Sequence, residues 1–151
     1  MRRAILTFLA LTLTACGTVD LGDNIVPPDL AVDDDFFFCQ IQPNVLNAHS
    51  CASGGAGDTG GCHASRSGMR LSATAETDQI PSCDADNKVT GAVPESYRAN
   101  LDAVRAELQS DPLSSPFYRR PVGLDSHPRV IFPESDPAAM LIVDWLSAGA
   151  M

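Results

Sequence analysis

Three residues in one short stretch have side chains that could do chemistry together. Cys62 and His63 are adjacent, and Cys51 precedes them across a loop of ten residues, five of which are glycine. Two thiols followed directly by an imidazole are what covalent haem attachment requires, and the usual spacing of that motif is C-x-x-C-H. The longer gap leaves two interpretations: a haem site with a bulged loop, or a glycine-rich loop closed by a disulfide.

The haem interpretation sets clear geometric demands on this stretch. The two thiols would form thioethers to the vinyl groups, and His63 would bind the iron as its proximal ligand. The loop must bulge and return both cysteines to one place, which glycine permits because it adopts backbone conformations closed to other residues. A second axial ligand must be histidine, methionine or absent. The candidates are His127, Met140 and Met69.

A zinc site is a third interpretation of the same region. Its ligands would be His49, Cys51, Cys62 and His63. Adjacent ligands at 62 and 63 give poor tetrahedral geometry, and oxidised thiols cannot bind zinc. We rank this interpretation last.

The N-terminus has the form of an export signal. Arg2 and Arg3 precede an apolar run at residues 4–13, which is too short to span a bilayer as a helix. Residues 13–16, Leu-Thr-Ala-Cys, match the lipobox of bacterial lipoproteins. That resemblance implies removal of residues 1–15 and lipid attachment at Cys16; a plain signal peptide would be cut nearby. Gly17 after the cysteine favours the outer membrane by the sorting pattern of such lipoproteins.

Composition divides the remaining chain into two parts. Residues 16–35 are rich in aspartate and poor in apolar residues, which predicts a flexible acidic tether, and residues 36–151 form one domain. The chain has 19 acidic and 10 basic residues, for a net charge of −9. Nucleic-acid binding needs clustered positive charge, so we expect no nucleic-acid partner. A basic redox or protein partner suits this charge better.

The cysteines after Cys16 number four, and an exported chain favours their oxidation. One account is two disulfides, with three possible connectivities. The other pairs Cys39 with Cys83 and leaves Cys51 and Cys62 to hold haem. Parity does not decide between the two.

Helical signals predict a mainly α domain of three or so helices joined by long Pro/Gly-rich loops. A short helix over 43–48 would begin at Pro43. The clearest helix runs from Pro94 to about Ser110, with apolar residues at helical spacing. The last covers 138–148, with Asp136 as N-cap. Because no nucleotide-binding or hydrolase motif is present, we predict no enzyme.

The order of these parts resembles the small cytochrome c-like domains of exported bacterial proteins, including planctomycete-type cytochrome c domains. The matching segments are Gln-Pro-Asn-Val-Leu at 42–46, Cys62-His63, Met-Arg-Leu at 69–71, Tyr-Arg-Ala-Asn-Leu at 97–101, Pro112-Leu113, His127, and the segment from Phe132 to Ala150 with its Trp145. The C-x10-C-H spacing and the loop around Cys83 depart from the family pattern.

The resemblance implies a cytochrome c-like fold that binds haem c and transfers electrons to a redox partner in the periplasm or at the cell surface. Cys51, Cys62 and His63 would then hold the haem, and His127 is the candidate distal ligand. The alternative function, of another class, is a cofactor-free structural or binding lipoprotein stapled by disulfides on a degenerate version of the same fold.

Overall fold

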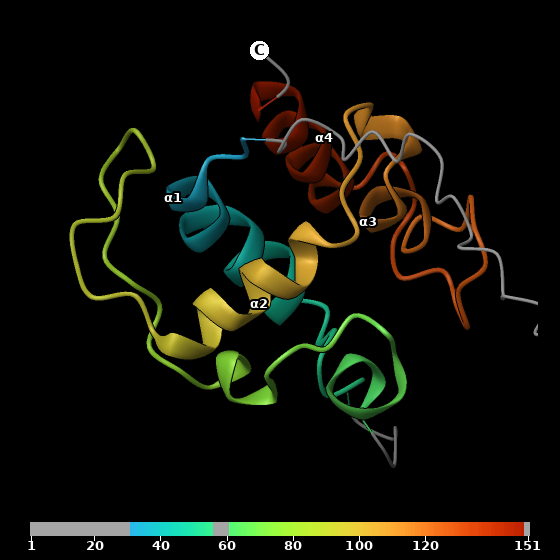
Figure 1. Ribbon diagram of the computed structural model, residues 1–151, viewed down its shortest axis with the longest axis horizontal. Helices are drawn as coiled ribbons and strands as arrows, with labels where there is room; N and C mark the ends of the chain where they lie inside the picture. Colours follow the sequence, from blue (N-terminus) through green and yellow to red (C-terminus); the bar gives the residue numbers. More distant parts are fainter. Residues whose placement is uncertain (1–30, 56–60, 150–151) are drawn as a thin grey trace, which may run out of the picture.

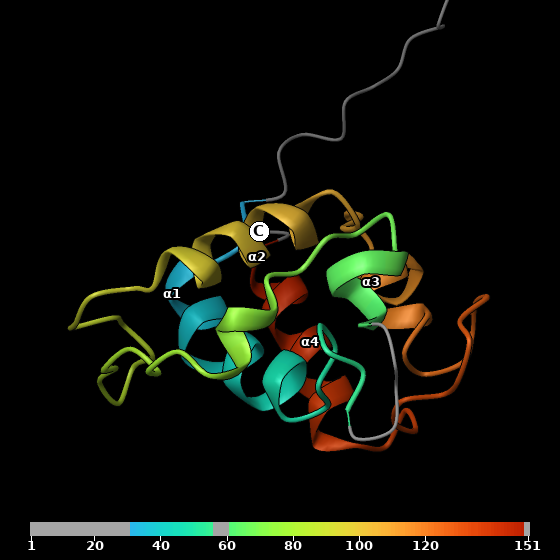
Figure 2. The ribbon, with the colours of Figure 1, turned by 90° about the horizontal axis from the view of Figure 1, so that it is seen from below.

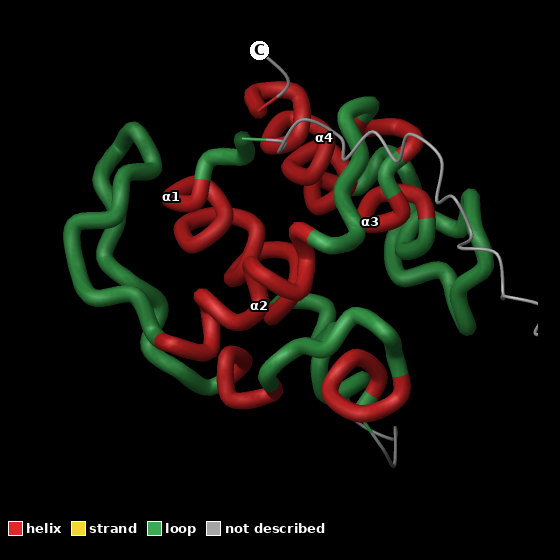
Figure 3. Tube along the Cα trace, in the orientation of Figure 1, coloured by secondary structure: helices red, strands yellow, loops and turns green. Residues whose placement is uncertain are grey.

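The computed structural model describes residues 31–55 and 61–149, and within them the chain is helical with no strand (Figure 1, Figure 3). This confirms the predicted mainly α class. The helices are α1 (Asp34–Phe36), η1 (Phe37–Asn47), η2 (Cys62–Arg66), η3 (Ala73–Glu76), α2 (Glu95–Arg105), η4 (Pro112–Ser114), α3 (Pro116–Arg119) and α4 (Pro137–Gly149). Cys16 and the predicted signal lie outside the described residues. None of the helices described is both long and apolar enough to span a bilayer.

The core forms where η1 packs against α4 and α2. Figure 1 shows α2 crossing in front of η1, and in Figure 2 both η1 and α4 lie below α2. The Trp145 ring of α4 lies 5.4 Å from the Phe37 ring of η1 and 6.1 Å from the ring of Phe117. All three side chains are buried, so this aromatic cluster joins the two ends of the domain.

The first helical region is longer than predicted, and Pro43 lies inside it rather than at its start. Proline cannot donate the backbone bond of an α-helix interior and crowds the preceding turn. η1 has the wider π pattern instead: Ala48 N–H donates to the Pro43 carbonyl at 3.2 Å, five residues back. The predicted helix over 43–48 is therefore only the second half of η1.

The domain begins before residue 36, where the tether was predicted to end. Val32 is buried, and Asp33 caps α1 by accepting from the Phe36 N–H at 3.2 Å. The indole Nε1–H of Trp145 donates to the Asp33 carbonyl at 2.8 Å. The acidic run is thus folded onto α4, a long-range contact that its polar composition conceals.

The two predicted C-terminal helices are present with small differences in length. α2 ends at Arg105 because the next turn tightens: Glu107 N–H donates to the Val104 carbonyl at 2.8 Å. α4 begins as predicted, with Asp136 Oδ1 accepting from the Ala138 N–H at 2.9 Å.

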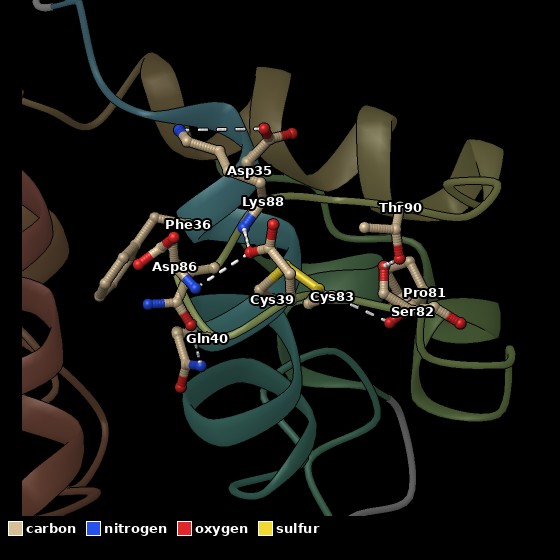
Figure 4. The surroundings of a disulfide bond; sticks show 12 residues. Asp35, Phe36, Cys39, Gln40, Pro81, Ser82, Cys83, Asp86, Lys88 and Thr90 are labelled. Atoms are coloured by element: carbon tan, nitrogen blue, oxygen red, sulfur yellow. Dashed lines mark hydrogen bonds and ion pairs between the residues drawn. A yellow bond between two sulfur atoms is a disulfide. The ribbon is translucent and has the colours of Figure 1, made fainter.

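A disulfide between Cys39 and Cys83 ties the long loop at residues 77–93 to η1, with Cα atoms 6.1 Å apart (Figure 4). This is the pairing expected alongside a haem site. Lys88 from the same loop forms an ion pair with Asp33 at 2.7 Å, and Gln40 Nε2 donates to Asn87 Oδ1 at 2.6 Å. We call residues 33–40 and 81–90 the disulfide corner.

Candidate functional site

A pocket lies between the end of η1, η2, α3 and the segment at residues 127–132. Its cavity has a volume of about 60 Å³ and is partly open to solvent. Its walls are mainly apolar, and Val45, Leu46, Phe117, Ile131, Phe132 and Ile142 contribute to them. All the candidate haem and zinc ligands and attachment residues singled out from the sequence, except Met140, line this pocket.

The long cysteine spacing does not separate Cys51 from Cys62 and His63. The His63 N–H donates to the Cys51 carbonyl at 3.2 Å, and the Ala64 N–H donates to the Ala52 carbonyl at 3.1 Å. The ten-residue loop therefore starts and ends at one place, and both cysteines line the same pocket. This is the arrangement that the bulged-loop interpretation requires.

The start of the loop is fixed by a carboxylate from η3. Glu76 Oε1 accepts from the N–H groups of Ala52 and Ser53, both at 3.0 Å. The Gly54 N–H then donates to the Ser50 carbonyl at 2.7 Å, and Gly54 has a φ of +86°, in the left-handed region that favours glycine. Glu76 had no signal in the sequence, because it lies in a polar segment without a motif.

Cys51 and Cys62 retain their thiols in the structure, so the loop is not closed by a disulfide. Burial raises the pKa of the Cys51 thiol to about 12, with smaller contributions from the negative charges of Glu76 and Cys62. A thiolate is therefore strongly disfavoured at this position. An uncharged form of the sulfur, such as a thiol or thioether, suits it.

His63 projects from η2 and is held by the backbone that follows. Its Nδ1 lies 3.3 Å from the Met69 carbonyl oxygen. Burial lowers the pKa of His63, and the Met69 carbonyl opposes this only in part. The ring is therefore biased to the neutral form, with the proton on Nδ1 and the lone pair on Nε2.

His127 has the same kind of orienting bond. Its Nδ1 lies 2.6 Å from the Arg129 carbonyl oxygen, which leaves the lone pair on Nε2. The His63 and His127 rings are nearly parallel, with centroids 6.1 Å apart and an angle of 18° between their planes. The sequence alone placed these two residues 64 positions apart with no sign of contact.

The two rings lie close enough that both imidazoles could contribute to one metal or cofactor site. Histidines that bind metals usually donate their other ring N–H to a carbonyl or carboxylate. Both histidines have that partner, which leaves both Nε2 atoms available as ligands.

The other candidate ligands are placed less favourably. Met69 lines the pocket, but its backbone carbonyl already orients His63. Met140 lies on α4 with 53% of its surface exposed and does not line the pocket. His49 lines the pocket and packs on the Phe132 ring at 4.8 Å. Across the described residues, no three His, Cys, Asp or Glu side chains cluster as a metal site would need, which leaves the zinc interpretation without support.

Two arginines at the pocket were not anticipated. Arg120 lines it and forms an ion pair with Glu107 at 2.7 Å, and Arg129 lines it and donates to the Gly54 carbonyl at 3.0 Å. Single arginines in loops carry no sequence pattern that would reveal such roles.

Comparisons with protein-family models, with curated proteins and with solved structures give no significant match to this chain. Any functional assignment therefore depends on the chemistry of the pocket itself.

Proposed function

We propose that this protein is a small c-type cytochrome-like electron-transfer protein whose pocket binds haem c. Cys51 and Cys62 would form the thioethers, His63 would be the proximal ligand and His127 the distal ligand. One observation carries the proposal: two imidazoles with carbonyl-bonded Nδ1 atoms stand nearly parallel, 6.1 Å apart, beside two thiols.

The chain's own residues suit this role in three further ways. The apolar walls would exclude water from a buried ring. The burial that raises the pKa of Cys51 to about 12 costs an uncharged thioether nothing. The carbonyls of Met69 and Arg129 orient each imidazole with its Nε2 lone pair available.

A haem iron held by two imidazoles supplies one-electron transfer and has no open position for a substrate. We therefore propose an electron carrier without enzymatic activity. Its partner would be a redox protein in the periplasm or at the cell surface, and a basic docking face would suit the net charge of −9. Lipid on Cys16 would anchor the protein to the outer membrane.

The deciding experiment is expression in a bacterial host that carries out haem c maturation, followed by denaturation, a haem stain and intact mass measurement. We expect a haem-sized mass gain that survives denaturation. Cys62→Ala should abolish double attachment, since one thioether is lost. Cys83→Ala serves as the matched control, because it removes a cysteine outside the pocket. A colourless protein with two disulfides would overturn the proposal in favour of the cofactor-free alternative.

The distal ligand has its own test in the haem-loaded protein. His127→Ala should keep the covalent mass gain but convert the visible spectrum from six-coordinate to five-coordinate or water-ligated iron. Met69→Leu is the control, since it leaves the backbone carbonyl that orients His63 in place. An unchanged spectrum in His127→Ala would show that another residue binds the distal position.

A further inference from the structure

The segment that carries His127 contacts the described part of the loop between the two cysteines through Arg129. Arg129 Nη2 donates to the Gly54 carbonyl at 3.0 Å. The backbone carbonyl of the same residue accepts from His127 Nδ1 at 2.6 Å. Arg129 thus contacts the loop with its side chain and the imidazole with its backbone.

The loop end of this connection is fixed independently. Glu76 holds the N–H groups of Ala52 and Ser53, and the Gly54 N–H is bonded to Ser50 at 2.7 Å. Gly54 is buried, and its φ of +86° is a conformation that other residues adopt only with strain. The carbonyl that receives Arg129 is therefore presented by a turn with little freedom to move.

The position of the loop that carries His127 depends more on Arg129. Residues 123–130 form no helix in the structure, and the residues flanking His127 are exposed. The Ile131 N–H donates to the Pro121 carbonyl at 2.8 Å, which closes this loop at its base. Between that base and its tip, the bond from Arg129 to Gly54 ties the loop to a distant part of the chain.

We infer that the buried turn at the start of the extra residues between Cys51 and Cys62 serves to position the second histidine, with Arg129 as the positioning residue. Gly54 belongs to those extra residues, and a C-x-x-C-H motif, with two residues between its cysteines, leaves no room for a comparable turn. This inference rests on the proposed function, in which His127 is the distal ligand. It gives the unusual cysteine spacing a purpose in that site.

The test compares Arg129→Met with Arg98→Met, both of which remove one positive charge. Arg98 lies exposed on α2 and does not line the pocket. In the haem-loaded protein, Arg129→Met should keep the covalent mass gain but bind added imidazole about tenfold more tightly, because His127 is displaced more easily. Arg129→Lys should recover part of the difference, since an ammonium can still donate to the Gly54 carbonyl.

A second readout does not need haem. In the haem-free protein, hydrogen exchange at the Ile131 amide should be about tenfold faster in Arg129→Met than in Arg98→Met, because the loop opens more often. Equal exchange and equal imidazole affinity in the two variants would overturn the inference. Faster exchange without tighter imidazole binding would overturn it too, because Arg129 would then stabilise the loop without positioning His127.

The two proposals fail in distinguishable ways. A protein that takes up no haem in the wild-type form refutes the proposed function and with it the ligand role of His127. A protein that takes up haem but shows no difference between Arg129→Met and Arg98→Met refutes only the role of Arg129. The nearby Arg119→Met variant is unsuitable as a control, since Arg119 bonds Asp125 within the same loop.

Discussion

The four cysteines of the folded part are used in two different ways. Cys39 and Cys83 form a disulfide in the disulfide corner, surrounded by ion pairs from Asp33 and Lys88. Cys51 and Cys62 keep their thiols and face a mainly apolar pocket. If the chain is exported, as its N-terminus predicts, a pair of retained thiols needs a reason, because two structural disulfides would otherwise be expected.

The surroundings of each pair indicate that reason. The disulfide corner joins a long irregular loop to η1 and contains charged groups that satisfy one another. The pocket instead places two oriented imidazoles beside its thiols, within mainly apolar walls. The first region crosslinks the fold, and the second suits the cofactor site proposed above.

Removing the disulfide should have the largest effect on stability and little on the pocket. The cysteines are 44 positions apart, so the crosslink stabilises the fold by about 4 kcal/mol in the chain-entropy account. Cys39→Ala with Cys83→Ala should lower the free energy of unfolding by up to that amount in urea titrations of the haem-free protein. The haem-loaded form should keep the wild-type visible spectrum, and a changed spectrum would contradict the separation of the two regions.

The main helices and the two cysteine pairs could be predicted in large part from local sequence signals. Helical periodicity and capping residues gave α2 and α4 to within a few residues, because both signals act within one or two turns. Cysteine parity in a chain predicted to be exported left the Cys39–Cys83 pairing as one of two accounts. The adjacency of Cys62 and His63 drew attention to the pocket directly.

What the sequence could not reveal depends on contacts between distant residues. The composition of the acidic run at residues 33–35 predicts a solvated tether. In the structure, Trp145 donates to the Asp33 carbonyl and holds this run against α4. Glu76 and Arg129 reach the cysteine loop from separate segments and share no spacing with it. Pro43 suggested a helix start because proline suits one, whereas the wider π pattern accommodates it inside η1.

The pH dependence of stability should be a smaller effect, and in the pocket it should come from His63. Burial lowers the pKa of His63 below its usual 6.5, so the unfolded chain takes up a proton that the folded haem-free protein resists. Stability should therefore fall as pH drops through about 6.5 and level off below the folded pKa. His63→Gln should flatten the free energy of unfolding between about pH 7 and pH 5. An unchanged slope would show that His63 does not titrate differently on folding.

The smallest effect on the free energy of unfolding should come from the disulfide corner, at more acidic pH. Burial raises the pKa of Asp33, but the hydrogen bond and charge of Lys88 together with the backbone N–H groups of Phe36 and Asp35 outweigh it, so the pKa is lowered overall from 3.8. Its contribution is then present above the unfolded pKa and lost as pH falls through the folded value, below about pH 4. Asp33→Asn keeps a cap for α1 but should remove this acid-range loss, while leaving the range near pH 6.5 unchanged.

The side chains of Asp33 and Lys88 are 41% and 53% exposed, so solvent weakens their attraction. In about 1 M salt, where the screening length is about 3 Å, the difference between Asp33→Asn and wild type should therefore shrink. The His63 effect should persist in the same salt, because it arises from burial rather than from an exposed ion pair. If salt removed both effects equally, the pocket would be no better shielded from solvent than the disulfide corner, and the contrast between the two regions would fail.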